Sequence, residues 1–327
     1  MSEAGRADVV ARAATAAMVF FRTGREQLFL ALSDDALDPG RAPTFRAVRR
    51  GEPVYAPSAG TIRDPALSPH RLGDGYWYVL HTRLSGEGVS YNSATGPVLG
   101  FLRSRNLVDW EPVGTGMLAV GAVRFTHCWA PKWFVDRDDG IHVIFSAATG
   151  PDHAPTPFGF FEMHPLTDDP AGAWSPPRPL TGRLPVDRLD AYLVREDDGR
   201  YACVYKNRVT HTLELAHAPA LHGPYAVTAA WDHWGLQEGP VLLRLADRRW
   251  RLFFDWPDNT PENYRFADST GRDLAATRWL GPRGEWGLVD AGGQELRHGT
   301  IVALEADDAA VVRDAIAASD SVGGQPS

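Results

Sequence analysis

The chain has 327 residues and a formal net charge of −8, and 44% of its residues are hydrophobic. This length suits either two ordinary domains or one large all-β domain. The negative charge and the lack of any run of five basic residues argue against nucleic-acid binding, which needs clustered Lys and Arg. No stretch approaches the roughly eighteen apolar residues of a membrane span.

The first apolar run, residues 13–21, follows Glu3 and Asp8 rather than a basic segment. We therefore expect it to be the first strand and not a secretory signal, which would begin with positive charge. A cytoplasmic location is the corresponding expectation. The two cysteines, Cys128 and Cys203, are too few for a disulfide framework or a CxxC metal site. We expect two free buried thiols, with one bridge as the alternative.

Strand signals dominate the chain. Five runs are rich in aromatic and aliphatic residues and begin at turn signals or charged residues, which is typical of strands: 26–33, 75–82, 140–147, 199–207 and 249–256. Asp-Gly pairs at 74–75, 139–140 and 198–199 predict tight hairpins. In residues 76–80 and 250–254 nearly every side chain is apolar or aromatic, which predicts strands covered on both faces.

Similar motifs recur at regular intervals. Asp64, Ala130, Asp190, Glu238 and His298 are separated by 66, 60, 48 and 60 residues. Five units of several short strands each are what a five-bladed β-propeller requires. A pair of β-sandwiches is the competing architecture.

We expect one all-β domain over residues 1–318, because no linker composition divides the chain. The segment up to residue 33 would pair with C-terminal strands, since ring closure removes exposed sheet edges. A helical period appears only over residues 305–318, and residues 319–327 are predicted to be a disordered tail.

Three carboxylates, those of Asp64, Asp190 and Glu238, occupy corresponding places in these units. A propeller would bring them to one spot although they are up to 174 positions apart in sequence. Carboxyl groups that converge in a pocket are the catalytic groups that cleave glycosidic bonds. Each has a structural alternative: Asp64 and Glu238 could stabilise turns, and Asp190 could be a buried hydrogen-bond acceptor.

The motifs and their order resemble those of glycoside hydrolase family 43, a family of five-bladed propeller arabinosidases and xylosidases. The resemblance runs from about Met18 to Glu305. It rests on Arg63-Asp64-Pro65, Asp74-Gly75-Tyr76-Trp77-Tyr78, Ser104-Arg105-Asn106-Leu107-Val108-Asp109-Trp110, Cys128-Trp129-Ala130-Pro131, Leu189-Asp190-Ala191, His222-Gly223-Pro224-Tyr225, Glu238-Gly239-Pro240 and Arg297-His298-Gly299-Thr300.

The resemblance implies a role for each matching residue. Asp64 corresponds to the general base that activates water, and Glu238 to the general acid that protonates the leaving oxygen. Asp190 corresponds to the acid that orients the proton donor and tunes its pKa. His298 corresponds to a histidine of the central channel, beside a bound Ca²⁺ or a water. No cofactor is required, and His298 is a candidate both for lining the substrate-binding pocket and for contacting a metal.

Other side chains are candidates for substrate binding. Arg63 and Lys206 could hydrogen-bond sugar hydroxyls, or they could be plain surface cations. Trp129 is a candidate platform for a sugar ring, and His127 could share its pocket. One departure from the family pattern is Lys132, which stands after Trp-Ala-Pro where an acid is usual.

The sequence therefore predicts an inverting glycosidase that releases terminal arabinofuranosyl, xylosyl or galactofuranosyl residues from a small oligosaccharide or glycoside. Two other functions fit the same scaffold. One is a biosynthetic enzyme that uses the acids for a cyclisation or isomerisation. The other is a carbohydrate-binding propeller without catalysis, because function depends on the site and not on the fold.

Overall fold

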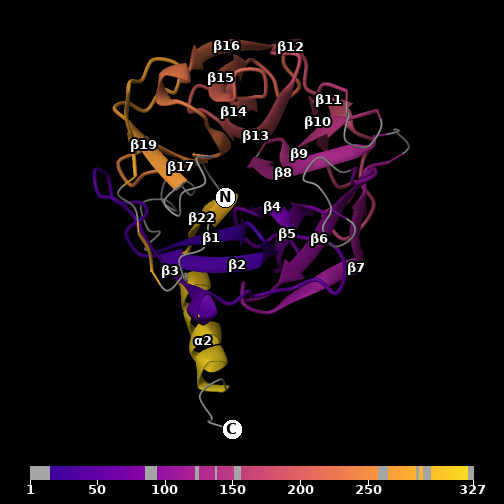
Figure 1. Cartoon of the computed structure of the whole chain (residues 1–327), viewed down its shortest axis with the longest axis vertical. Coiled ribbons are helices and arrows are strands. Elements are labelled where there is room, and N and C mark those ends of the chain that lie inside the picture. Colours follow the sequence, from indigo (N-terminus) through magenta and orange to yellow (C-terminus); the bar gives the residue numbers. More distant parts are fainter. Residues whose placement is uncertain are drawn as a thin grey trace.

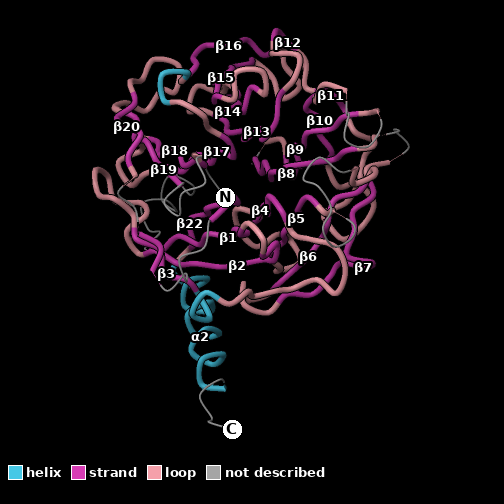
Figure 2. Tube along the Cα trace, viewed as in Figure 1, coloured by secondary structure: helices cyan, strands magenta, loops and turns pink. Residues whose placement is uncertain are grey.

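The computed structural model describes residues 15–84, 94–121, 125–136, 138–150, 156–256, 264–284, 287–289 and 296–322. Five sheets radiate from a central axis, and strands make up most of the trace (Figures 1 and 2). The protein is a single-domain five-bladed β-propeller, as the spacing of the motifs predicts. Helix α2 (Ala306–Val322) extends from the ring below the blade that contains β2 and β3.

Four blades follow in chain order, each starting with its innermost strand. The first is β4 (Arg63–Leu67), β5 (Trp77–Thr82), β6 (Val98–Ser104) and β7 (Trp110–Ala119); the second is β8 (His127–Asp136), β9 (Gly140–Ala148), β10 (Gly159–Met163) and β11 (Arg178–Pro179). The third is β13 (Arg188–Arg195), β14 (Tyr201–Asn207), β15 (Thr212–Ala218) and β16 (Tyr225–Ala230), with β12 (Gly182–Arg183) at its edge. The fourth is β17 (Glu238–Arg244), β18 (Trp250–Asp255), β19 (Tyr264–Ser269) and β20 (Trp279–Arg283).

The fifth blade closes the ring from both ends of the chain. Its order is β21 (Gly287–Val289), β3 (Thr44–Ala47), β2 (Arg25–Ser33), β1 (Thr15–Arg22) and β22 (Leu296–Leu304). Strands β1 and β22 are antiparallel, with Met18 opposite Ile301. The prediction that the N-terminal segment pairs with C-terminal strands is confirmed. Two short 3₁₀ helices, η1 (Val48–Gly51) and η2 (Asp232–Trp234), lie in connections.

The five predicted strands correspond to β2, β5, β9, β14 and β18. The three Asp-Gly pairs lie in the turns that join the innermost strand to the next one. Gly75, Gly140 and Gly199 have φ of 80°, 87° and 87°, a conformation that glycine adopts without steric cost.

The strands are covered on both faces because blades pack against one another. In β5, Trp77 and Val79 belong to one hydrophobic cluster, whereas Tyr78 and Leu80 belong to another. Successive side chains of a strand point to opposite faces. The run of apolar residues is therefore the signature of a blade placed between two neighbours. Both cysteines are buried and free, as expected.

Helix α2 begins one residue later than predicted and continues four residues past residue 318. Residues 319–322 are thus helical and not part of a disordered tail. The segment Ser319-Asp320-Ser321 is polar but contains no glycine or proline, and the first glycine after the helix is Gly323. Residues 323–327 lie outside the described part of the chain. Within that part, no helix is long and apolar enough to cross a membrane.

Candidate functional site

The innermost strands share a β-bulge close to their first residues. Four of them, β4, β8, β13 and β17, shift register there relative to the next strand. In each, one residue has positive φ: Asp64 (49°), Ala130 (48°), Asp190 (61°) and Gly239 (61°). A bulge re-aims side chains locally, and the innermost strands contact one another around the ring. The repeated bulge therefore brings residues from different blades together at the centre of the ring, and we call this group of residues the channel.

The bulges correct one expectation about the acids. Asp64 and Asp190 do occupy equivalent positions, but the residue equivalent to them in β17 is Gly239. Glu238 lies one step earlier, at the position of Arg63 in β4. The Glu238 side chain therefore projects from a different position of its strand than the side chains of the two aspartates do. Counting residues between similar tripeptides could not reveal this offset of one.

Asp64 contacts one hydrogen-bond donor and one ion-pair partner. Thr82 Oγ1 donates to Asp64 Oδ2 at 2.6 Å, and His298 Nε2 lies 2.9 Å from Asp64 Oδ1. Burial raises the pKa of this carboxyl, but His298, Arg63 and Thr82 together hold the pKa well below its usual range. Because 13% of the side chain stays exposed, an ionised oxygen can meet a solvent molecule.

His298 links Asp64 to a second, fully buried carboxylate. Its Nδ1 lies 2.8 Å from Asp255 Oδ2, and its main-chain N–H donates to the same oxygen at 3.0 Å. Burial lowers the pKa of His298, but Asp255 and Asp64 outweigh it and raise the pKa to about 9. His298 is therefore an imidazolium at neutral pH that contacts both Asp64 and Asp255, and its charge opposes the rise that burial causes in the pKa of Asp255.

Asp255 is a site residue that the sequence reasoning missed. It ends β18 opposite Glu238 in the neighbouring strand. The sequence does contain a signal for it, because Asp255 follows the wholly apolar run Leu252-Phe253-Phe254. A fully buried charge in such a setting is rare unless it is paired.

Glu238 is paired to two cations. Lys206 Nζ lies 2.5 Å from its Oε2, and the Arg297 guanidinium binds its Oε1. Arg297 Nε also lies 2.9 Å from Asp255 Oδ2. Opposite charges at this range favour the ionised carboxylate. Arg297 is a further residue that the sequence reasoning did not single out.

Asp190 and Lys132 complete the channel. Asp190 Oδ2 accepts a hydrogen bond from the Gly239 N–H at 3.0 Å, so it fixes the backbone next to Glu238. Lys132 is 1% exposed and donates from Nζ to the Gly299 carbonyl at 2.6 Å. Burial lowers the pKa of Lys132 to about 8, although Asp190, Asp64 and Asp255 oppose the shift. The residue that departs from the family pattern is thus a buried cation near three carboxylates.

This donor set is a poor match for Ca²⁺. Ligand atoms of Glu238, Asp255 and His298 do lie within 4.8 Å of one another. However, Ca²⁺ takes six to eight oxygen ligands, and the carboxylates here are already bound by side-chain cations. A Ca²⁺ ion would meet Lys132, Lys206, Arg297 and the His298 imidazolium at the same place.

The remaining predicted residues lie around this centre. Arg63 is next to Asp64, with its guanidinium 5.4 Å from the Phe21 ring centre. His127 is fully buried beside Trp129, at 5.4 Å between ring centres. Trp129 is 8% exposed and lies against Phe158 at 4.7 Å. The ring face of Trp129 that lies against Phe158 is therefore closed to a sugar.

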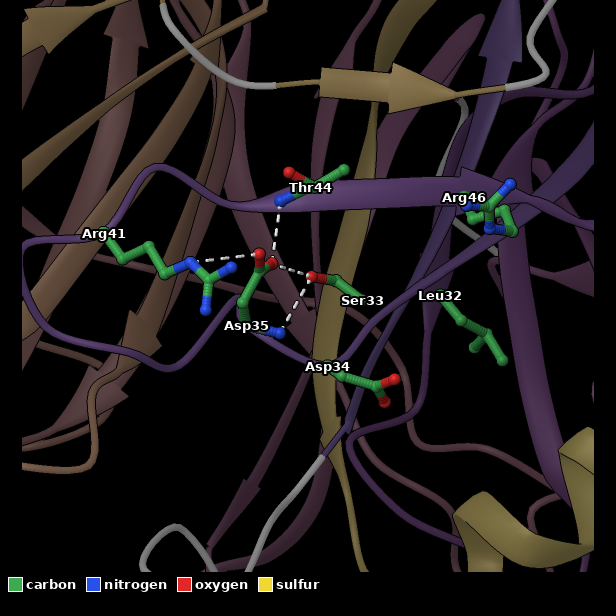
Figure 3. A pocket seen from close by; sticks show the side chains of 7 residues that line it. All are labelled: Leu32, Ser33, Asp34, Asp35, Arg41, Thr44 and Arg46. Atoms are coloured by element: carbon green, nitrogen blue, oxygen red, sulfur yellow. Dashed lines mark hydrogen bonds and ion pairs between the residues drawn. The ribbon is translucent and has the colours of Figure 1, made fainter.

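Among the described residues, cavities also occur away from this centre. One, of about 290 Å³, borders β2 and β3, and there Asp35 faces Ser33, Thr44 and Arg41 (Figure 3). Its Oδ1 accepts from the Ser33 hydroxyl at 2.6 Å and from the Thr44 N–H at 2.8 Å, so Asp35 stabilises the local turn. The other, of about 460 Å³, borders the second and third blades. Neither is lined by the acids of the channel.

Two solved structures illustrate what this chain is similar to. An exo-β-1,3-galactanase from Clostridium thermocellum is 15% identical, with a TM-score of 0.49 over 68% of this chain and 48% of its own. An α-L-arabinofuranosidase from Lactobacillus brevis is 17% identical, with a TM-score of 0.46 over 67% of this chain and 71% of its own. The chain spans about half the length of the galactanase, and both likenesses are too distant to bear on the substrate.

No curated protein matches the sequence. In contrast, the family described as "Probable glycosyl hydrolase domain", which is related to glycoside hydrolase family 43, matches residues 14–310. Because this match spans nearly the whole chain, the protein belongs to the glycosyl hydrolases related to glycoside hydrolase family 43.

Proposed function

We propose that this protein is an inverting glycosidase that releases a terminal arabinofuranosyl, xylosyl or galactofuranosyl residue from a small oligosaccharide or glycoside. The observation that carries the proposal is the contact of Asp64 with an imidazolium inside a channel that also holds Glu238. Inverting hydrolysis needs one ionised and one protonated carboxyl on opposite sides of the scissile bond.

In this mechanism Asp64 is the general base. Its depressed pKa keeps it ionised at neutral pH, and Thr82 and His298 fix its orientation. Asp64 removes a proton from water as the water oxygen bonds to the anomeric carbon. Glu238 gives its proton to the departing oxygen as the glycosidic bond breaks. Arg63, His127, Trp129 and Lys206 remain candidate substrate-binding residues.

Glu238 must acquire a proton before it can act as the acid. In the free protein Lys206 and Arg297 bind both of its oxygens, which favours the charged form. We propose that a bound sugar takes over one of these cations through its hydroxyls and that Glu238 is protonated in the complex. Asp190, through the Gly239 N–H, keeps the Glu238 backbone in place during this exchange.

We propose that this chemistry needs no metal. The channel's positive charge would come from Lys132 and His298, both buried beside the carboxylates. A Ca²⁺ ion at His298 is the alternative that this proposal replaces. A cytoplasmic location also remains a prediction.

A carbohydrate-binding propeller without hydrolysis is the second candidate. The observation that favours it is again the pairing of Glu238 with two cations, because a carboxylate in that state accepts hydrogen bonds from hydroxyls but donates no proton. A biosynthetic acid–base enzyme on the same scaffold would share the Asp64 geometry.

The test is a panel of aryl furanosides and xylosides assayed with wild type, Asp64→Asn and Glu238→Gln. We expect Asp64→Asn to lose at least about 10²–10⁴-fold in kcat/KM on every substrate that wild type cleaves. Glu238→Gln should lose much less on dinitrophenyl glycosides, whose leaving group needs no proton, than on alkyl glycosides. NMR of the first product formed should show the inverted anomer.

Glu111→Gln serves as the matched control, because Glu111 is a carboxylate on outer strand β7 paired only to exposed Arg103 among the described residues. Its activity should equal that of wild type. Hydrolysis that survives both channel substitutions would reject the mechanism. Sugar binding without turnover would support the second candidate, and neither binding nor turnover would point to the biosynthetic alternative.

A further inference from the structure

Three histidines surround one buried glutamate at the junction of the second and third blades. Glu162 has a side chain with no exposed surface, and its Oε1 lies 2.7 Å from His142 Nδ1 and 3.0 Å from His164 Nδ1. His222 Nε2 lies 2.9 Å from Oε2. Ligand atoms of His142, Glu162 and His164 all lie within 4.8 Å of one another. This group, which we call the His142 cluster, is separate from the channel acids.

The strand register explains why these residues meet. Glu162 on β10 is opposite Ile144 on β9, and His142 is two residues before Ile144. Residues two apart in a strand share a face, so His142 and Glu162 are diagonal neighbours on one face. His164 follows Glu162 by two residues and continues the same face. His222 comes from the connection that precedes β16 of the third blade.

The hydrogen bonds of His142 allow two protonation states of its imidazole ring. Its Nε2 lies 2.7 Å from the Asp139 carbonyl, an acceptor, so Nε2 carries a proton. Its Nδ1 faces the Glu162 carboxylate, which is also an acceptor. Nδ1 must therefore either be protonated, which makes His142 an imidazolium, or direct its lone pair at a cation held between ring and carboxylate. In the second state Nε2–H to a backbone carbonyl is the support that metal-binding histidines usually have.

The cluster can be reached from solvent. The cavity of about 460 Å³ between the two blades is lined by His142, His164 and His222. The exposed fractions of these three side chains are 9%, 37% and 29%. Glu162 is behind them, so the ligand atoms face a path by which an ion can enter, as a functional metal site requires.

We propose that His142, Glu162 and His164 bind a divalent transition metal, with Zn²⁺ as the best match, and that His222 either holds Glu162 or becomes the fourth ligand. Two imidazoles and a carboxylate with one open position form a common zinc set. Imidazole nitrogens also select against Ca²⁺ and Mg²⁺, which prefer oxygen.

The two contacts of Glu162 with the histidines require only a small movement. Zn–N and Zn–O bonds of about 2.0–2.2 Å at tetrahedral angles separate ligand atoms by about 3.3 Å. The present separations of 2.7 and 3.0 Å would thus open by a few tenths of an ångström. The ion replaces the proton on each ligating Nδ1, and these protons pass to solvent.

The experiment uses the whole chain, without an affinity tag and freed of metal by a chelator. Zn²⁺ is titrated in competition with a chromophoric chelator, and Co²⁺ is titrated as a spectroscopic probe. We expect one equivalent of Zn²⁺ per cluster and intense visible Co²⁺ bands typical of four-coordination. His164→Gln changes the most exposed ligand and should weaken binding by about 100-fold or more.

Two control variants locate the ion. His217→Gln alters another buried histidine, whose Nε2 lies 3.0 Å from the single carboxylate of Glu196 and whose Nδ1 pairs with Thr228. His298→Gln alters the channel. Both should retain the cluster's affinity for Zn²⁺ and its Co²⁺ spectrum. A wild type that binds no Zn²⁺ at micromolar concentration, or binding that His164→Gln retains and His298→Gln abolishes, would overturn the proposal.

Discussion

At the scale of single residues, the site is a chain of alternating charges. Asp64 contacts the His298 imidazolium, which contacts Asp255, and Arg297 joins Asp255 to Glu238. Each buried charge meets an opposite one, which is the condition under which charges are tolerated in a protein interior. His298 is the central member because it touches two carboxylates at once.

The pKa of His298 predicts a pH-dependent stability. Its folded-state pKa of about 9 exceeds the unfolded value of about 6.5, so its stabilisation is complete below pH 6.5 and is lost as pH rises toward 9. We expect the unfolding free energy of wild type, relative to His298→Gln, to fall by about 2 kcal/mol between pH 6 and pH 8. Urea unfolding at both pH values measures it.

The comparison with His298→Gln keeps Lys132 from masking this effect. The pKa of Lys132 is depressed to about 8, so its deprotonation relieves a buried charge and raises stability as pH rises through that value, but Lys132 is present in both proteins and this gain is common to them. If wild type and His298→Gln change in parallel from pH 6 to pH 8, His298 is not the charged bridge described above.

At the scale of elements, the bulge in each innermost strand sets the site. The left-handed conformation costs a residue with a Cβ about 1–2 kcal/mol, yet Asp64, Ala130 and Asp190 all adopt it. In β17 the same position is Gly239, where an added Cβ would lie 2.1 Å from His298 Cγ. Close packing of β17 on β22 therefore excludes a side chain at that step and moves the acid one residue back, to Glu238.

Gly239→Ala should destabilise the protein by more than about 3 kcal/mol, through backbone strain plus displacement of His298. It should also impair any activity that depends on Asp64. Gly75→Ala is the control, because Gly75 has φ of 80° but no atom within 4 Å of the added Cβ. Its cost should be about 1–2 kcal/mol. Equal melting temperatures for the two variants would show that His298 is not packed against this bulge.

Helix α2 offers a second prediction at this scale. Val312 has no exposed surface and packs in the cluster that includes Leu304 and Val48, whereas neighbouring Val311 is 40% exposed. Val312→Ala should lower the unfolding free energy by about 2 kcal/mol. Val311→Ala should change it by no more than about 0.5 kcal/mol. Denaturant titration of the pair would show no difference if the helix does not dock on the closing blade.

At the scale of the whole molecule, the ring is closed by pairing the two ends of the chain. Strand β1 lies between β2 and β22, so the closing blade depends on both. The strands of the closing blade contain no tryptophan, because all eleven tryptophans of the sequence lie outside them. Tryptophan fluorescence therefore reports mainly on the other blades, and Trp77 and Trp110 also pack against the closing blade.

Met18→Ala tests whether the blades unfold together. Met18 is fully buried in the cluster between the closing and fourth blades, so its truncation should cost about 2–5 kcal/mol. In a cooperative ring this cost shifts the tryptophan fluorescence transition as much as the circular-dichroism transition. A fluorescence midpoint that stays at the wild-type value would mean that the other blades unfold independently.

The sequence by itself determined the architecture, because its signals are local. The continuous apolar run of β5, the Asp-Gly turns and the intervals between motifs predicted strands, hairpins and five blades. The same motifs singled out Asp64, Asp190 and Glu238. The helix end was misplaced because a polar segment without glycine can be either helix or tail.

Only the tertiary structure determines which residues of the site contact one another. Asp255 is 43 residues from His298, and Lys132 is 167 residues from the carbonyl of Gly299, so no local pattern pairs them. The offset of Glu238 from Asp64 arises because the close approach of His298 leaves no room for a side chain at Gly239, a long-range contact that a repeat interval of about sixty residues cannot reveal. The charge state of each group follows from these long-range contacts, since burial and partners set a pKa and the residue type only supplies its starting value.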